Sequence, residues 1–154
     1  NLPAAPFYDS LQAYFDEHAI TVFTQQVVRD AVSAIRADKL PDPKVRPSAG
    51  SFFKNALIES WQMDSLRQAH PDIKAYEMGN GTYKLATGWL IESLGFKGQT
   101  LHGMHVNEGN ALVLINESAA SYADLAAARD EIIGRVRDTY QVLIEQEPLE
   151  IPAF

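Results

Sequence analysis

Residues 49–55 read AGSFFKN and place a single hydroxyl, that of Ser51, directly before two aromatic rings and a lysine. The preceding stretch, LPDPKVRPSAG at residues 40–50, contains three prolines and cannot form a helix. We therefore predict that residues 49–55 form a strand. Side chains alternate along a strand, which assigns Ala49, Ser51, Phe53 and Asn55 to one face and Phe52 and Lys54 to the other.

The segments around this strand show both helical and strand patterns. Apolar spacing and capping residues predict helices at residues 24–39, 56–70, 88–95 and 121–141, with Thr24 and Ser121 as N-caps. Residues 73–87 predict a hairpin that turns at Gly79-Asn80-Gly81, residues 99–117 predict two strands around Gly109, and residues 142–151 predict a last strand. Residues 1–17 show no clean period and predict an ordered arm. The fold class expected is α+β, a small antiparallel sheet with helices packed on one face.

Composition excludes several classes of function. The 154 residues include no cysteine, which removes disulfides, thiolate catalysis and cysteine-ligated metals. A net charge of −7 argues against a nucleic-acid partner, and no apolar run approaches the length of a membrane span. With no signal segment, we expect a cytoplasmic protein. A basic island (Lys39, Lys44, Arg46 and Lys54) is compatible with a site for a small anion, or with a solvated loop.

The polar residues taken alone form no recognisable catalytic set. Ser51 has no adjacent base and lies outside any nucleophile-elbow motif, so hydrolysis is disfavoured. His102 and His105 are three apart, which on a strand sends them to opposite faces, and we expect no metal site. Glu145 and Glu147 share a face of the last strand, either at a cleft or at a solvated edge. Tyr8 and Tyr14 could stack on a base or anchor the arm.

Four motifs taken together resemble a known family. KLPDPKVRPSAGSFFKN (39–55), YKLATGWLIESLGFKG (83–98), NALVLINE (110–117) and LIEQE (143–147) are similar, in order, to the carboxy-terminal domain of UDP-N-acetylenolpyruvoylglucosamine reductases. The resemblance implies that residues 24–154 are this substrate-binding domain, with residues 1–23 an arm leading into it. It also implies that the parent enzyme uses FAD and NADPH to reduce UDP-N-acetylenolpyruvoylglucosamine to UDP-N-acetylmuramate in peptidoglycan precursor synthesis, in the bacterial cytoplasm.

The resemblance also assigns roles to six residues. Ser51 matches the family's catalytic serine, a proton donor rather than a nucleophile, and Glu147 matches its active-site glutamate. Residues that hold the UDP-sugar match Lys39, Asn55, Asn110 and, in a looser alignment, Tyr8.

Three departures from the family pattern are visible. Ala56 stands where the family usually has proline, residues 101–107 replace a stretch of smaller residues, and the arginine and glycine that usually follow the glutamate are missing after Glu147. The family's flavin-binding domains match nothing in these residues, and a start at Asn1 is what an excised piece would show. We expect the isolated chain to bind neither FAD nor NADPH and to be inactive alone. The alternatives are a free-standing nucleotide-sugar-binding module without redox activity and a purely structural domain.

Overall fold

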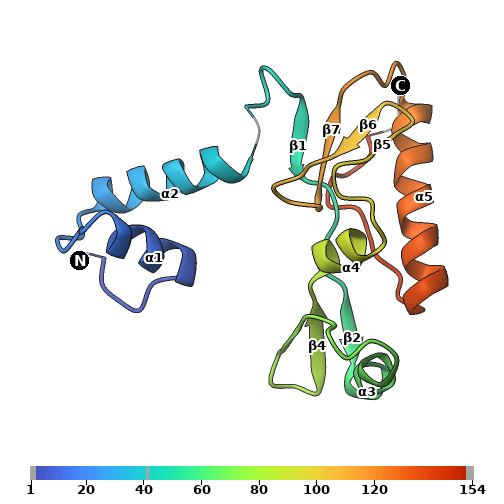
Figure 1. Cartoon of the computed structure of the whole chain (residues 1–154), viewed down its shortest axis with the longest axis horizontal. Helices are drawn as coiled ribbons and strands as arrows, with labels where there is room; N and C mark the ends of the chain where they lie inside the picture. The colour runs from blue at the N-terminus through green and yellow to red at the C-terminus, as the bar shows by residue number, and fades with distance from the viewer. Residues whose placement is uncertain (1–2, 41, 152–154) are drawn as a thin grey trace. The chain divides into compact units, whose positions relative to one another are not determined.

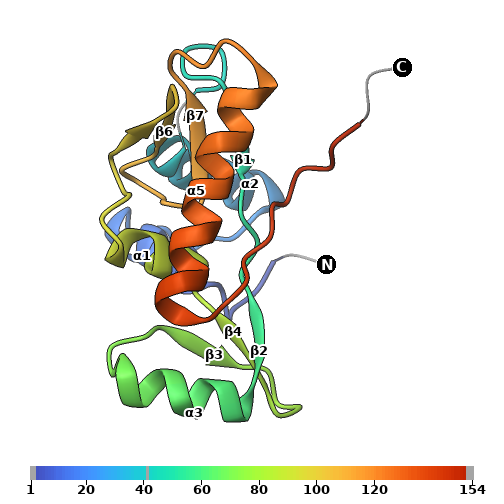
Figure 2. The ribbon, with the colours of Figure 1, turned by 90° about the vertical axis from the view of Figure 1, so that its right-hand side faces the viewer.

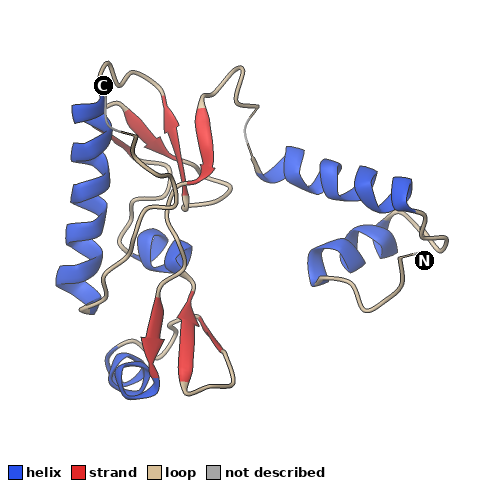
Figure 3. Ribbon diagram, turned by 180° about the vertical axis from the view of Figure 1, so that it is seen from behind, coloured by secondary structure: helices blue, strands red, loops and turns tan. Residues whose placement is uncertain are grey.

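A computed structural model describes residues 3–40 and 42–151, except for the side chain of Lys39. The chain forms two compact units, Asn1–Asp42 and Pro43–Phe154. Figure 1 labels their helices and strands, and Figure 3 shows how helix and strand alternate in the second unit. Among the described residues no helix combines the length and the apolar character needed to cross a bilayer.

The first unit contains two helices, α1 (Asp9–Glu17) and α2 (Gln25–Lys39). The helix predicted at 24–39 is confirmed, because Thr24 caps α2 by accepting a hydrogen bond from the amide of Val27. The sequence predicted an ordered arm over residues 1–17 and did not predict the helix α1 within it. Leu11 and Phe15 lie one helical turn apart and bury together, a repeat too short to stand out in the sequence.

The second unit contains two antiparallel sheets rather than one. The larger has the order β1-β7-β6-β5, built from β1 (Ser48–Ser51), β7 (Val113–Asn116), β6 (Met104–Val106) and β5 (Thr100–Leu101). The smaller has the order β2-β4-β3, built from β2 (Leu57–Glu59), β4 (Thr82–Leu85) and β3 (Ala75–Glu77).

Three helices cover these sheets, and the α+β class is confirmed. In Figure 2 the long helix α5 (Tyr122–Tyr140) runs along the larger sheet, and α3 (Ser60–Ala69) lies across the smaller one. The short helix α4 (Thr87–Ser93) contacts α5. α5 buries Ala128, Ile132, Val136 and Tyr140 at helical spacing. Ser121 is its N-cap as predicted, and it also forms a capping box with Asp124.

Two element boundaries differ from the sequence prediction. The helix predicted to begin at residue 56 begins at Ser60, because residues 57–59 alternate exposed, buried, exposed and pair with β4 as a strand. The strand predicted over residues 142–151 does not form. Val142 and Ile144 are buried and Leu143 is exposed, so the alternation is real, but pairing is limited to one isolated bridge.

The loop between β5 and β6 is a hairpin that the sequence did not predict. His102 and Gly103 have φ angles of +49° and +79°, the conformation of a tight two-residue turn. His-Gly is not one of the usual signals for such a turn. A Cβ atom on Gly103 would lie 2.5 Å from the backbone nitrogen of Ala119, so only glycine fits.

Gly103→Ala should therefore lower the free energy of unfolding by about 2 kcal/mol or more, through backbone strain and collision with Ala119. Gly134→Ala is the matched control, because Gly134 lies inside α5 with open space at its Cβ position. It should stabilise the protein by up to about 1 kcal/mol through helix propensity. Urea unfolding followed by circular dichroism measures both changes. Equal effects of the two substitutions would contradict this account of the turn.

Candidate functional site

Ser51 lies at the end of β1, beside a bulge in the larger sheet. Ser48 pairs with Ile115 and Ser51 with Val113, so β1 has one residue more than its partner over this interval. Gly50 lies inside the bulge with a φ of +76°. A bulge with a left-handed glycine bends its strand and re-aims the next side chain. Here it leaves Ser51 exposed at the edge of the strand.

The two phenylalanines after Ser51 anchor this end of the strand. Phe52 is 6% exposed and Phe53 1%, and their rings contact edge to face with centroids 5.1 Å apart. The predicted alternation of faces is therefore wrong beyond Ser51. The amides of Phe52 and Phe53 both point to the carbonyl of Leu112, at 2.6 and 3.4 Å, which ends the regular ladder and allows consecutive residues to turn inward.

The segment 145–147 pairs with the other side of the phenylalanine segment. Glu147 donates its amide to the carbonyl of Phe52 at 2.7 Å, and Lys54 donates its amide to the carbonyl of Glu145 at 2.9 Å. Both Ser51 and Glu147 are exposed. Neither side chain has an ion-pair or hydrogen-bond partner among the described residues. The pairing thus brings two predicted site residues onto neighbouring segments with their polar groups open to a ligand.

Asn55 ends the same segment and is held by α4. Its Oδ1 accepts a hydrogen bond from the amide of Thr87 at 3.1 Å, and Thr87 Oγ1 accepts one from the amide of Ala56 at 3.0 Å. Thr87 is fully buried, so its bond to the amide of Ala56 is shielded from water, whereas the bond to exposed Asn55 is only partly buried. No pattern in the sequence singles out Thr87.

Asn110 lies at the same end of α4. Its Oδ1 accepts from the amide of Leu112 at 3.1 Å and lies 4.0 Å from where a Cβ on Gly88 would be. Asn55 and Asn110 therefore both use their carbonyl oxygens internally. No described residue accepts a hydrogen bond from either NH₂ group, and both amides present donors to a ligand.

Two predicted site residues belong to the first unit. Tyr8 precedes α1 and is 88% exposed. Its role is not tested by the arrangement of the second unit, because it belongs to the first. Lys39 ends α2, and its side chain lies outside the described residues.

The basic island is partly neutralised in the second unit. Arg46 Nη2 lies 3.1 Å from Glu117 Oε1, and Lys54 Nζ lies 3.5 Å from Glu145 Oε2. Both pairs are partly exposed and contribute little to stability. They do lower the positive charge available to an anion.

Arg129 of α5 fixes the chain on both sides of Glu147, a role that the sequence did not reveal. Its Nη1 bonds Gln146 Oε1 at 3.0 Å and also pairs with Glu150. Hydrogen bonds from Tyr122 and Gln146, with the charge of Arg129, lower the pKa of Glu150. A hollow of about 670 Å³ lies beside this contact, lined by Phe52, Tyr122, Leu125, Gln146, Pro148 and residues 149–151.

The four histidines all have partners away from Ser51. His102 pairs with Glu131, and His105 bonds Glu108 and Thr100. His18 bonds the carbonyl of Tyr14, and the ring of His70 contacts that of Tyr140. Within the described ranges no three histidine or acidic side chains are grouped to hold a metal ion. None of these rings acts as a base for Ser51.

The fold and the site together define a small α+β domain. In this domain the exposed polar side chains of Ser51, Asn55 and Glu147 lie around the buried segment Phe52-Phe53. The chain belongs to the family of UDP-N-acetylenolpyruvoylglucosamine reductases, whose C-terminal domain model matches residues 42–151. The predicted family membership is confirmed.

Curated relatives carry the same name. The reductase of Paraburkholderia phymatum is 45% identical over 82% of this chain, and that of Bordetella pertussis is 44% identical over 84%. The reductase of Burkholderia cenocepacia is 43% identical over 92%. This chain covers 36%, 37% and 41% of these three relatives, respectively. It therefore corresponds to less than half of each.

The contact between Asn55 and Thr87 can be tested without a ligand. Thr87→Val keeps the shape of the side chain but leaves the buried amide of Ala56 without an acceptor, which should cost about 1–3 kcal/mol in the free energy of unfolding. Amide hydrogen exchange at Ala56 should accelerate as well. Thr139→Val, at an exposed position of α5, should change stability by less than about 0.5 kcal/mol. If Thr87→Val changed neither the free energy of unfolding nor the exchange at Ala56, the bond between Thr87 and Ala56 would not stabilise this segment.

Proposed function

We propose that this chain supplies the substrate-binding and proton-donating domain of an FAD- and NADPH-dependent reductase that converts UDP-N-acetylenolpyruvoylglucosamine to UDP-N-acetylmuramate in the bacterial cytoplasm. Family membership supports the proposal. The observation that carries it is the hydrogen bond between Glu147 and Phe52, which holds Glu147 beside Ser51 with both side chains exposed. The domain division at residues 23 and 24 is part of this proposal.

We infer that the flavin binds outside this chain. The hollow beside Phe52 is mainly apolar, and its carboxylate, Glu150, would repel a dinucleotide's diphosphate. The nearby cation, Arg129, is already paired. We assign FAD to the flavin-binding domains of the parent enzyme, where it supplies the hydride that adds to the vinyl end of the substrate.

Ser51 supplies the proton that completes the reduction. After hydride addition the neighbouring carbon is strongly basic, so a weakly acidic hydroxyl in the right place is a sufficient acid. Because the hydroxyl gives up its proton only at that moment, it needs no histidine to activate it beforehand. The absence of a bonded base among the described residues suits a donor better than a nucleophile.

Glu147 and the two asparagines serve different parts of the substrate. Glu147 lies where a fixed charge can influence the substrate's carboxylate and enol as electrons move. Asn55 and Asn110, with their NH₂ groups presented, suit the carbonyl and phosphate oxygens of the UDP portion. Lys39 adds a point charge for the diphosphate, and Tyr8 closes over the nucleotide.

Ser51→Ala in the full-length enzyme should separate the two halves of the reaction. Flavin reduction by NADPH should be unchanged, because that step does not involve the serine. Reoxidation by the enolpyruvyl substrate should slow by about 10²–10⁴, the usual contribution of a positioned proton donor. Stopped-flow absorbance in the flavin band measures both steps.

Ser51→Cys should retain part of the activity, since a thiol can deliver a proton from nearly the same position. Reoxidation at the wild-type rate in Ser51→Ala would show that Ser51 serves only packing. The same result together with a slow Glu147→Gln enzyme would transfer the donor role to Glu147.

Lys39→Ala should weaken binding of UDP-N-acetylglucosamine to this chain by about 1–3 kcal/mol, the loss of one charged hydrogen bond. Calorimetry measures this directly, and Lys74→Ala, a change at another exposed lysine, should have little effect. Unchanged affinity in Lys39→Ala would exclude Lys39 from the site. The alternative is a nucleotide-sugar-binding module without redox activity. It would be favoured if this chain bound UDP-N-acetylglucosamine but the parent reading frame encoded no flavin-binding domain.

A further inference from the structure

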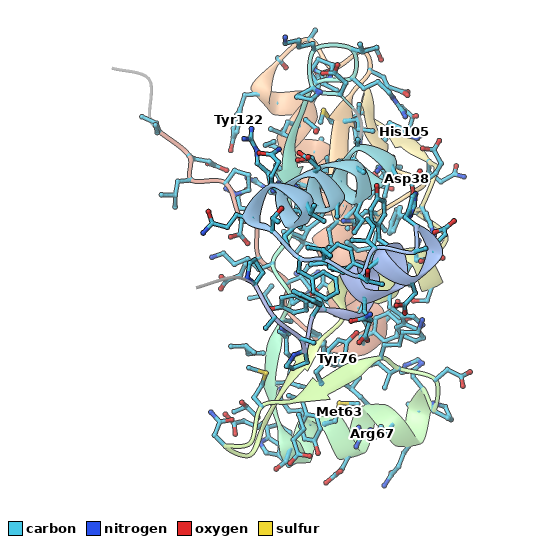
Figure 4. All side chains as sticks on the ribbon, turned by 90° about the vertical axis from the view of Figure 1, so that its left-hand side faces the viewer. Asp38, Met63, Arg67, Tyr76, His105 and Tyr122 are labelled. Carbon is cyan, nitrogen blue, oxygen red and sulfur yellow. The ribbon has the colours of Figure 1, made fainter. Side chains whose placement is uncertain are left out.

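His105 lies in β6 at the centre of a polar network that the proposed reaction does not use. Its side chain is 8% exposed, and both ring nitrogens have partners. Nε2 lies 2.9 Å from Glu108 Oε1, and Nδ1 lies 2.9 Å from Thr100 Oγ1. We call Arg46, Thr100, His105, Glu108 and Glu117 the His105 network. Figure 4 labels His105 among the side chains.

The hydrogen bonds of the network determine how many protons His105 carries. Thr100 has one hydroxyl hydrogen, and its Oγ1 lies 3.1 Å from the carboxylate oxygen of Glu117, which can only accept. With that hydrogen donated to Glu117, Thr100 must accept from Nδ1 of His105. Nε2 must donate to the carboxylate of Glu108. All three bonds exist together only when both ring nitrogens of His105 are protonated.

The charges around the ring agree with this count. Arg46 precedes β1 and approaches Glu117 at 3.1 Å and Glu108 at 3.8 Å, while Nδ1 of His105 lies 3.7 Å from Glu117. Two cations and two carboxylates make the network neutral when His105 is charged. A neutral ring would leave one excess negative charge and one hydrogen bond fewer. A hydrogen bond from its own backbone amide, followed by that from His105, lowers the pKa of Glu108.

The network also joins the segments that carry the proposed substrate contacts. Glu108 lies in the loop between β6 and β7, two residues before Asn110. Arg46 lies next to Pro47, whose carbonyl accepts from the amide of Asn116 at 2.8 Å where β1 and β7 meet. His105 therefore connects β5 and β6 to the loop of Asn110 and to the entrance of β1.

We propose that His105 is a positioning residue whose doubly protonated form holds the loop of Asn110 in its binding arrangement, so that the site takes UDP-sugars more tightly when His105 is charged. The link to binding rests on the proposed function of Asn110. The sign follows from the bond between His105 and Glu108. As pH rises and His105 loses a proton, this bond is lost if Nε2 gives up its hydrogen, and it loses its charge assistance if Nδ1 does. In both cases the loop is held less firmly and affinity falls.

The protonation state and the loop can be tested on the unliganded 154-residue chain by NMR. Both ring nitrogens of His105 should be protonated at the acid end of a pH titration, and one of them should lose its proton as the pH is raised. Amide hydrogen exchange of residues 108–112, corrected for its intrinsic pH dependence, should lose protection over the same interval. A ring that is singly protonated at the acid end, or protection that does not follow the titration, would overturn the proposal.

Binding of UDP-N-acetylglucosamine, measured over the same pH range, tests the consequence. Wild-type affinity should fall by about 3- to 10-fold as His105 deprotonates, the value of roughly one net hydrogen bond. His105→Gln and Glu108→Gln should bind like the wild type at high pH and show no such dependence. The matched control is His102→Asn, which breaks the exposed pair with Glu131 and should keep the wild-type pH profile.

The two proposals fail in different ways. If the wild-type chain does not bind UDP-N-acetylglucosamine at any pH, the proposed function fails, while the NMR readouts still decide the role of His105. If the wild type binds with an affinity independent of pH, or if His102→Asn removes the dependence, the role of His105 is excluded and the proposed function stands.

Discussion

The structure of the second unit depends on the backbone hydrogen bonds that hold residues 52–54 on both sides. Leu112 accepts from the amide of Phe52 on one side, and residues 145–147 pair with the segment on the other. Two buried phenylalanine rings keep this three-stranded contact closed, each worth about 1.5–3 kcal/mol by burial. Since Ser51 and Asn55 flank the segment and Glu147 is bonded to it, displacement of these rings would move all three residues.

Different residues hold the backbone and present polar groups to solvent. Buried groups such as Thr87 and Phe53 fix the backbone. The atoms proposed to meet the substrate belong to neighbouring polar side chains, and these atoms make no hydrogen bond within the described residues. Three cations of the second unit, Arg46, Lys54 and Arg129, are paired with carboxylates. If the proposed function holds, this unit recognises the UDP portion through the amide groups of Asn55 and Asn110, whose orientation is fixed by their internally bonded oxygens.

The sequence predicted the long, regular features well and the local exceptions poorly. Helical spacing and caps sufficed for α2 and α5, and the Gly-Asn-Gly turn sufficed for β3 and β4. The strand faces at Phe52 failed because the bulge at Gly50 and the shared acceptor Leu112 depend on a partner strand that no local pattern reveals. The roles proposed for Ser51, Asn55, Asn110 and Glu147 rest on family resemblance. Thr87, Arg129 and the His105 network depend on contacts distant in sequence, which explains why they were missed.

The central claim is that the residues around the 52–54 segment form one surface for a UDP-sugar. Chemical-shift mapping of the 154-residue chain with UDP-N-acetylglucosamine tests it most directly. The account predicts that the largest perturbations cluster at residues 51–56, the side-chain amides of Asn55 and Asn110, and residues 145–147. Perturbations centred instead on the hollow between α3 and α5, lined by Trp61, His70 and Tyr140, would contradict it.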